Sequence, residues 1–351
     1  MSHPVRAWTF TNGYPSTLRL STIQIPPENQ VPPTHLVVKI SACALNPVDI
    51  QIMNLPHFSL PTLGGEKTTA MDFAGTVVAA GGRSEFAKGD AILGMAFASY
   101  APAGGALAEY AHLDARTTVA VRKPGAWPVE KAAGISLVWL TAKACVEAVA
   151  PWVEKTASRR VAVLGGSSAT GMYITMLAKR RGWKVVATSS ARNRGFVVDE
   201  LKADAHVDYT AEHVRTAVGN FEPDAVVDCV GGTECIGLPS SKRYITIVGD
   251  KTGRTTMGGP ATYYDPMHPY YAVAQWVRWA RGKFGLGESY DVVILDQKSE
   301  WLEEATETLS ADDIYIDSVY EFEDAKQAFE RLNTGRAKGK VVIRVGDRSS
   351  G

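Results

Sequence analysis

The spacing of hydrophobic residues changes once along the chain. Up to about residue 127, apolar or β-branched segments at 37–42, 75–80 and 91–94 are short and are separated by turn-forming proline and glycine residues. From residue 129 onward, apolar positions at helical spacing alternate with short continuous apolar runs. Strands that are buried on both faces of a parallel sheet give such continuous runs. The pattern therefore predicts a β-rich, partly barrel-like first part and an α/β second part with a doubly wound parallel sheet.

The second part is predicted to begin with a long helix that starts at Val129. Six apolar runs after it are predicted to be the strands of the parallel sheet, at residues 161–164, 184–188, 205–209, 224–230, 244–249 and 290–295.

Three elements follow the sixth run. They are two amphipathic helices at 301–309 and 322–332 and a strand at 340–345. A completed six-stranded sheet has no place for them, so we expect them to rejoin the first part. The predicted domains are therefore residues 1–127 together with 297–351, and residues 128–296.

Composition narrows the class of partner. The 351-residue chain is 45% hydrophobic and 21% charged, which is ordinary for a globular protein, and its 37 basic residues balance 37 acidic ones. It therefore has no net positive field that would favour nucleic acid or an anionic membrane. We find no apolar run of about 18 residues and no leader-like pattern at the N-terminus, so we expect no membrane span and a cytoplasmic location. The four cysteines form no C-x-x-C pair, which indicates reduced thiols.

A glycine-rich turn lies between the first two predicted strands. Residues 161–171 read VAVLGGSSATG, and a helical pattern follows. A strand that passes through such a turn into a helix directs backbone N–H groups and the positive end of the helix dipole at one point, which suits a pyrophosphate. The turn departs from the G-x-G-x-x-G spacing because Ser168 stands at the second glycine position, and a tight connection without a ligand is the alternative. The cofactor-binding residues predicted in this turn are Gly166, Ser167, Ser168, Ala169, Thr170 and Gly171.

The residues after the second predicted strand indicate which dinucleotide would bind. NAD-specific sites carry an acidic residue there, which binds the 2′-hydroxyl of the adenosine ribose. This chain has the run SSARNR at 189–194 and no acid before Asp199. Hydroxyl and guanidinium groups suit a 2′-phosphate, although the arginines could also be a solvated helix start. We therefore predict NADPH, held here by Ser189, Ser190, Arg192 and Asn193.

Six short motifs occur along the chain in a fixed order. They are ALNPVD at 44–49, MDFAGTV at 71–77, GGALAEY at 104–110, LTA at 140–142, the glycine turn, and GRAKGKVV at 335–342. In this order they resemble the medium-chain dehydrogenase/reductase superfamily, and more narrowly its zinc-free quinone oxidoreductase and enoyl reductase branch, which has fungal members. The resemblance covers nearly the whole chain. It implies a Rossmann domain that binds the cofactor and a β-rich, GroES-like catalytic domain.

The same resemblance bears on metal binding. Zinc-dependent members carry cysteine, histidine and glutamate ligands where this chain has Asn46, Met71 and Asp72. Asparagine is a poor zinc ligand and methionine is a soft one, so we predict no metal. Without a metal, the hydride acceptor must already be polarised, which favours a quinone or a conjugated enone or enal over a simple alcohol or ketone.

The resemblance also implies roles for residues outside the two cofactor motifs. Asn46 and Thr141 are expected to act near the nicotinamide, although Asn46 could simply form a turn with Pro47 and Thr141 could bond to its own helix. His57 is a candidate acid where mitochondrial-type enoyl thioester reductases carry a tyrosine, and a solvated loop histidine is the alternative. The other predicted cofactor contacts are Pro47, Asp49, Tyr209, Val230, Gly231, Val248, Gly249, Gly339 and Lys340.

Three functions remain open at this point. The first is an NADPH-dependent reductase of free quinones or enones, the second is a trans-acting enoyl reductase that acts on a carrier-bound polyketide or acyl chain, and the third is an NADPH-binding sensor or scaffold. The aromatic-rich segment 255–287 is expected to form a helix that packs in the core or at a dimer interface, or else lines an acceptor pocket. We expect a monomer or a homodimer, with residues 292–295 as the candidate edge strand.

Overall fold

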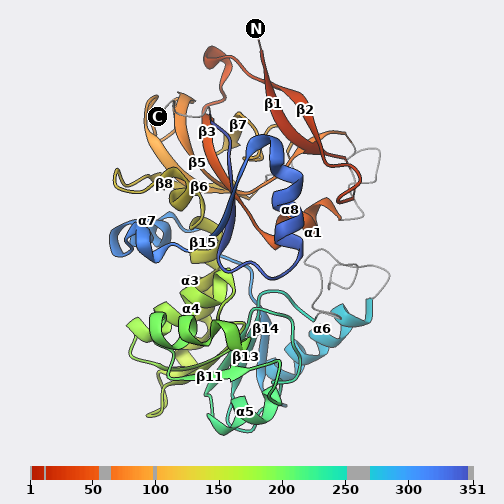
Figure 1. Ribbon diagram of the computed structural model, residues 1–351, viewed down its shortest axis with the longest axis vertical. Helices are drawn as coiled ribbons and strands as arrows, with labels where there is room; N and C mark the ends of the chain where they lie inside the picture. The colour runs from red at the N-terminus through yellow and green to blue at the C-terminus, as the bar shows by residue number, and fades with distance from the viewer. Residues whose placement is uncertain (1, 12, 55–64, 98–100, 251–268, 347–351) are drawn as a thin grey trace. The chain divides into compact units, whose positions relative to one another are not determined.

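The computed structural model of the chain describes residues 2–11, 13–54, 65–97, 101–250 and 269–346. These residues divide into two compact units, residues 2–137 with 297–346 and residues 138–250 with 269–296. The chain of each unit can be followed by colour in Figure 1.

The first unit is built on a seven-stranded sheet. Its strands follow the order β15-β16-β3-β5-β6-β8, and β7 pairs with β3 outside this path. The C-terminal strand β16 therefore lies beside β3, and it runs antiparallel to it. The strands are β3 (His35–Leu45), β5 (Asp72–Ala80), β6 (Ala91–Ala96), β7 (Tyr110–Asp114), β8 (Thr118–Arg122), β15 (Ile316–Glu321) and β16 (Lys340–Arg344).

A second, three-stranded sheet in this unit was not predicted from the sequence. Its order is β2-β1-β4, with β1 (His3–Phe10), β2 (Arg19–Ile25) and β4 (Lys67–Thr68). Trp8 of β1 and Phe73 of β5 share one buried core with Phe329 of α8. The burial of such large side chains stabilises the unit by about 1.5–3 kcal/mol each. The helices of the unit are α1 (Pro47–Met53), α2 (Val129–Ala133), α7 (Ser299–Thr308) and α8 (Ala325–Asn333), with short 3-10 turns η1 (Glu28–Gln30), η5 (Ala311–Asp313) and η6 (Phe322–Asp324).

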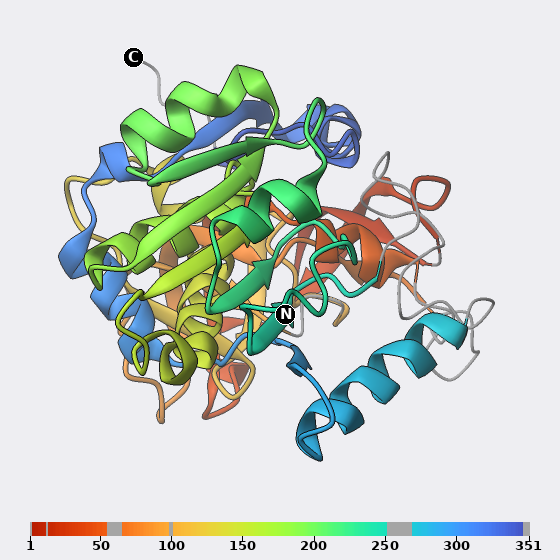
Figure 2. The same cartoon turned by 90° about the horizontal axis from the view of Figure 1, so that it is seen from below.

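The second unit contains a six-stranded parallel sheet in the order β11-β10-β9-β12-β13-β14, whose strands can be followed in Figure 2. Counted from the first strand of the unit, this is the order 3-2-1-4-5-6 of dinucleotide-binding domains. Each strand falls on one of the six predicted apolar runs, although β11 ends one residue earlier than predicted and β12, β13 and β14 end two or three residues earlier. The strands are β9 (Arg160–Leu164), β10 (Lys184–Ser189), β11 (Ala205–Asp208), β12 (Ala225–Asp228), β13 (Arg243–Thr246) and β14 (Ser289–Val292).

Helical segments connect these strands. They are α4 (Ala169–Arg180), η3 (Ala191–Asn193), the π-helix η4 (Phe196–Glu200), α5 (Val214–Asn220) and α6 (Pro269–Lys283), and α3 (Ser136–Val153) precedes the sheet. All four cysteines of the chain are buried and form no disulfide.

The long helix predicted from Val129 is in fact two helices. Helix α2 ends at Gly134, whose N–H donates to the Lys131 carbonyl at 3.0 Å, and α3 begins at Ser136. A Cβ at position 134 would lie 2.9 Å from Ile316 Cδ1, so glycine leaves room for the start of β15. The prediction missed this break because the apolar spacing continues through it.

Helix α3 corrects the expectation that no segment has the length and hydropathy of a membrane span. Its 18 residues have a mean hydropathy of 1.2, and 72% of the helix is buried inside the protein. A long, largely apolar helix that is buried in this way is typical of a protein core.

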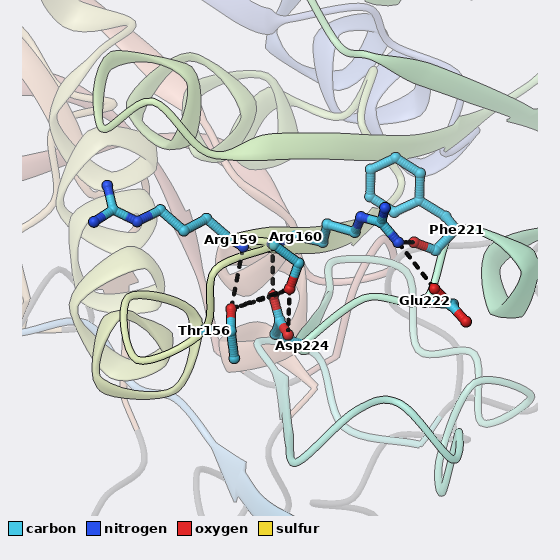
Figure 3. A network of polar contacts seen from close by, with 7 residues as sticks. Thr156, Arg159, Arg160, Phe221, Glu222 and Asp224 are labelled. Atoms are coloured by element: carbon cyan, nitrogen blue, oxygen red, sulfur yellow. Dashed lines mark hydrogen bonds and ion pairs between the residues drawn. The ribbon is translucent and has the colours of Figure 1, made fainter.

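A polar network holds the amino ends of two central strands of the second unit (Figure 3). The carboxylate of Asp224, just before β12, accepts hydrogen bonds from Thr156 Oγ1 at 2.8 Å, from the Ser158 hydroxyl at 3.0 Å and from the Arg160 N–H at 2.6 Å. The Arg160 guanidinium also lies over the ring of Phe221. These residues lie at the edge of the sheet opposite the carboxyl ends, so the network is structural.

Helix α6 presents its apolar side to solvent. Of the two packings expected for it, in the core or at a dimer interface, packing in the core is wrong. The exposed fractions of Val273, Trp276 and Val277 are 60%, 71% and 52%. The opposite side carries the buried Gln275 and the half-buried Arg278. The helix is therefore polar toward its own unit and apolar toward solvent. Tyr263 and Tyr264 of the same aromatic segment lie outside the described residues.

Candidate functional site

The glycine turn lies at the carboxyl end of β9, where α4 begins. Gly165 has a φ of +85°, a conformation that residues with a Cβ rarely adopt. Its N–H donates to Thr188 Oγ1 at 2.9 Å, which ties the turn to the neighbouring strand β10. Ser168 is the N-cap of α4, and its Oγ accepts a hydrogen bond from the N–H of Gly171 at 3.0 Å. The turn therefore enters the helix in a fixed geometry.

The residues of this turn fit a dinucleotide pyrophosphate. A Cβ at Gly171 would lie 2.2 Å from the Gly165 carbonyl oxygen, and one at Gly166 would lie 2.6 Å from Ala187 Cβ, so neither position admits a side chain. The first turn of α4, which begins with Ala169, carries no acidic residue. The approach to the helix N-terminus is thus lined by small residues, and the partial positive charge of the helix dipole is not cancelled there.

The residues predicted to select NADPH lie at the carboxyl end of the next strand. Ser189 is the last residue of β10 and is buried, Ser190 precedes η3, and the side chain of Arg192 is exposed. Asn193 Nδ2 donates to Ser167 Oγ at 3.1 Å, so the two cofactor motifs, 26 residues apart, are in direct contact. Together they form one polar surface of hydroxyl, amide and guanidinium groups.

Asp228, at the carboxyl end of β12, is a site residue that sequence reasoning missed. Its Oδ1 accepts the N–H groups of Val230 and Gly231, both at 2.9 Å, and its Oδ2 accepts the Thr246 hydroxyl at 3.0 Å. Burial raises the pKa of Asp228 to about 6, and these hydrogen bonds oppose the rise. An acidic residue at the end of an apolar strand, three positions before a pair of glycines, was the available signal. Thr246 Oγ1 in turn accepts the N–H groups of Val248 and Gly249. The backbone N–H groups of four predicted cofactor contacts are therefore bonded to Asp228 or Thr246, and these four are Val230, Gly231, Val248 and Gly249.

In the first unit, three strands meet at a buried cluster of Asn46, Asp72 and Lys340, here called the cation cluster. Strand β3 ends at Leu45, which lies opposite Val341 of β16, so Asn46 and Lys340 are brought together just beyond that pair. Asp72 begins β5 on the other side of β3. The exposed fractions of Asn46, Asp72 and Lys340 are 1%, 0% and 2%.

Hydrogen bonds within the cation cluster hold the Asn46 amide on both sides. The Lys340 ammonium donates to Asn46 Oδ1 and, at 2.9 Å, to Asp72 Oδ2. Asn46 Nδ2 donates to the same Asp72 oxygen at 3.0 Å, and Asp72 Oδ1 accepts the N–H of Leu137 in the first turn of α3 at 2.9 Å. Asn46 is therefore a positioned amide in a charged cluster as well as the N-cap residue of α1.

Asp49 adjoins the cation cluster and is fully buried. Its Oδ2 accepts the Asn46 N–H at 2.7 Å at the start of α1. Burial raises the pKa of Asp49 to about 7; the Asn46 N–H and the Lys340 ammonium oppose this rise, and the Asp72 carboxylate adds to it. Asp49 thus changes its charge near neutral pH, next to a fixed ammonium.

The cation cluster does not fit a zinc ion. Two of the candidate ligands, Asn46 and Asp72, already bind the Lys340 ammonium through their oxygens. A divalent cation at these oxygens would meet a fixed positive charge, and the buried Met71 offers only a soft thioether.

The remaining predicted site residues are placed in both units. Pro47 is the first residue of α1, and Gly339 directly precedes β16 and Lys340. Thr141 is buried in α3, and Tyr209 follows β11 with 45% of its surface exposed. His57 lies outside the described residues, so its role stays a prediction.

Comparison with protein families gives one match in each half of the chain. Residues 32–123 match the alcohol dehydrogenase GroES-like domain family, and residues 201–343 match the zinc-binding dehydrogenase family. The trans-enoyl reductase pgmF of Aspergillus terreus is 28% identical over 97% of this chain and 96% of its own length. The mitochondrial NAD(P)H oxidoreductase RTN4IP1 of Danio rerio is 28% identical over 89% of this chain and 84% of its own.

Solved structures share the fold over almost the whole chain. A quinone oxidoreductase from Coxiella burnetii has a TM-score of 0.78 at 23% identity and covers 98% of this chain and 100% of its own. The mycobacterial protein Rv1454c, complexed with NADPH, has a TM-score of 0.70 at 21% identity and covers 97% of this chain and 100% of its own.

The matched domains, the 3-2-1-4-5-6 sheet and the glycine turn agree with the resemblance to the medium-chain dehydrogenase/reductase superfamily and support a nicotinamide-dependent oxidoreductase of this type. Relatives and fold neighbours that are named as enoyl reductases and quinone oxidoreductases are similar to this chain.

Proposed function

We propose that the protein is an NADPH-dependent oxidoreductase that works without a metal and delivers hydride to a quinone or to a conjugated enone or enal. The observation that carries the choice of NADPH is the joined polar surface at the carboxyl ends of β9 and β10. The glycine turn and the run 189–194 contact each other there through the hydrogen bond from Asn193 to Ser167, and this surface offers cations and hydroxyls where an NAD site offers a carboxylate.

The residues that would hold NADPH divide by the part of the cofactor they suit. The backbone of the glycine turn and the N-terminus of α4 suit the pyrophosphate. Ser190 and Arg192 suit the 2′-phosphate, because a guanidinium matches phosphate oxygens in a bidentate way. When bound, NADPH supplies the hydride. Asp228 holds Val230 and Gly231 after β12 and the Thr246 side chain at the end of β13 through hydrogen bonds, which favours a preformed site at these strand ends.

The choice of acceptor rests on the chemistry of the cation cluster. The Lys340 ammonium already donates to Asp72 and Asn46, so this cluster does not present it as a donor that would polarise a substrate carbonyl. An acceptor that is polarised in its own structure, such as a quinone or an enone, fits such a site. We propose Asn46 as a positioning residue: Asn46→Ala is expected to lower kcat at least tenfold and to change the Kd for NADPH less than about twofold.

The test is NADPH oxidation measured with purified protein against a panel of quinones, enones, enals, saturated ketones and alcohols. We expect turnover with the conjugated acceptors and none with the saturated ketones. The use of NADPH deuterated at C4 identifies the hydride acceptor, because deuterium must then appear in the reduced product. Tight NADPH binding without turnover on any acceptor would instead support a sensor or scaffold.

A second candidate, a trans-acting enoyl reductase, is favoured by the 28% identity to the pgmF enzyme over 97% of the chain. Matched enoyl thioesters separate the two, one on a small thiol and one on a carrier protein. A kcat/KM that is higher with the carrier-bound thioester than with free enones would select this candidate.

We infer a cytoplasmic homodimer as the working form. Strand β14 ends the parallel sheet and helix α6 packs beside it (Figure 1), while the apolar side of α6 faces solvent. Light scattering after size exclusion tests the dimer: Val273→Asp with Trp276→Asp should give a monomer, and a wild-type monomer would contradict it. Imaging of the tagged full chain tests the location, since one relative is named as mitochondrial.

A further inference from the structure

A histidine that the proposed function does not use contacts the 2′-phosphate end of the cofactor site. His206 lies on β11, opposite Ala187 of β10. Its Nε2 lies 2.8 Å from Ser189 Oγ, within hydrogen-bond distance. Ser189 is buried and begins the run 189–194 that is proposed to hold the 2′-phosphate. His206 is therefore one hydrogen bond away from that site.

The charges around His206 are of both signs. Burial lowers the pKa of His206 from its ordinary 6.5, the Asp208 and Glu212 carboxylates oppose this, and the Arg194 guanidinium adds to it. Both carboxylates are engaged elsewhere: Asp208 accepts the Thr210 hydroxyl at 2.7 Å, and Glu212 accepts the Asp208 N–H at 2.7 Å. The imidazole is only half-buried, so a proton can reach it from solvent.

The helices that pack against β11 carry further charged or titratable groups. Asp199 and Glu200 of η4 are exposed. Arg215 of α5 donates to three main-chain carbonyls, and His213, the N-cap of α5, is bonded to Thr216. The groups of α5 are thus engaged in contacts of their own, and Arg194, Asp208 and Glu212 remain the charges that act on His206.

We propose that His206 favours NADPH over NADH by taking up a proton when the 2′-phosphate binds. This inference rests on the proposed function. Without a ligand the imidazole is neutral at pH 7, and its Nε2 can accept the Ser189 hydroxyl hydrogen. A phosphate that carries between one and two negative charges favours the imidazolium, and the proton comes from solvent.

Protonation also reverses the hydrogen bond to Ser189. The imidazolium Nε2–H donates to Ser189 Oγ, and the hydroxyl hydrogen then donates to the Ser190 carbonyl oxygen, which lies 3.2 Å from Ser189 Oγ, or to a bound anion. The site then presents one further positive charge beside Arg192 and Arg194 and one further donor. NADH lacks the 2′-phosphate and leaves His206 neutral, so it gains neither.

The test is isothermal titration calorimetry of the full chain near pH 6.5 in buffers of different ionisation enthalpy, which reports the protons taken up on binding. We expect the wild type to take up about half a proton with NADPH and close to none with NADH. In His206→Gln the uptake with NADPH should vanish or become a small release, because only the phosphate then titrates. In His206→Gln the Kd for NADPH should rise about twofold to fivefold at pH 6, which is the size of effect expected when one partly exposed charge pair is lost. At pH 8 the Kd should change little.

The matched control is His213→Gln, which alters an exposed histidine of the same unit and should behave as the wild type. If His206→Gln unfolds by circular dichroism, His206→Asn serves in its place. Equal proton uptake with NADH, or an uptake that persists in the His206 variant, would overturn the inference and leave the proposed function standing. Absence of NADPH binding in the wild type would overturn both.

Discussion

Replacement of Lys340 by methionine would remove a buried charge and keep most of the side chain. The ammonium and the Asp72 carboxylate are 2.9 Å apart, and their side chains are 2% and 0% exposed. At an effective dielectric constant of about 20, Coulomb attraction at this distance is about 6 kcal/mol, of which desolvation cancels a part. Removal of one partner of such a pair leaves an uncompensated charge and costs about 3–5 kcal/mol. We therefore expect Lys340→Met to lower the stability of the first unit by this amount.

The assay must report on the first unit alone, because a chain of two units does not unfold in one step. Hydrogen exchange of peptides from β3 and β16, followed by mass spectrometry, gives the local free energy of opening. Lys39→Met is the matched control, since Lys39 is an exposed lysine on β3, and its effect should stay within about 0.5 kcal/mol.

A double-mutant cycle with Asp72→Asn completes this test. The amide that this substitution introduces is neutral, and its oxygen could still accept the Leu137 N–H, so the double variant should be more stable than the sum of the single effects by about 2 kcal/mol. A cost of Lys340→Met below about 1 kcal/mol, or strictly additive effects, would refute the view that the cation cluster holds the ends of the three strands.

Three further predictions concern single residues. Because burial raises the pKa of Asp49 to about 7, the folded protein binds more protons than the unfolded chain between about pH 4 and 7, and its stability should fall as the pH rises through this range. Asp49→Asn should flatten the profile of Tm against pH, and an unchanged profile would contradict the assignment. Gly171→Val should weaken NADPH binding at least about 100-fold by calorimetry, because a Cβ there would lie 2.2 Å from the Gly165 carbonyl, and a Kd within threefold of wild type would show that the turn does not form the cradle. Arg192→Ala should raise the Kd for NADPH about tenfold and leave that for NADH unchanged; an equal effect on both cofactors would place Arg192 outside the 2′-phosphate site.

The sequence predicted the α/β sheet well because its four central strands, β9, β10, β12 and β13, are buried along nearly their whole length. The run around Val226 is a continuous apolar segment, and burial alone requires that pattern. Features that depend on contacts between distant segments were not readable. The hairpin of β1 and β2 alternates too weakly to stand out, and the helix break at Gly134 depends on Ile316, which is far away in the chain.

The candidate site could likewise be predicted only in part from the sequence. Asn46 and Lys340 were each selected from motifs, but their contact spans 294 positions and follows from the register of β16 on β3. Asp72 was considered only as a replaced metal ligand, and Asp228 only as part of a strand. Both are carboxylates whose roles are set by burial and by the donors around them, and these are properties of the folded chain.

The most direct test of the central claim combines elemental analysis with turnover. The purified full chain is dialysed against a chelator, its zinc content is measured, and NADPH oxidation by a quinone and by an enone is followed before and after dialysis. The account predicts undiminished turnover at less than about 0.1 zinc per chain, since the Lys340 ammonium holds the oxygens that zinc would need. One zinc per chain whose removal abolishes turnover, and whose return restores it, would contradict the account.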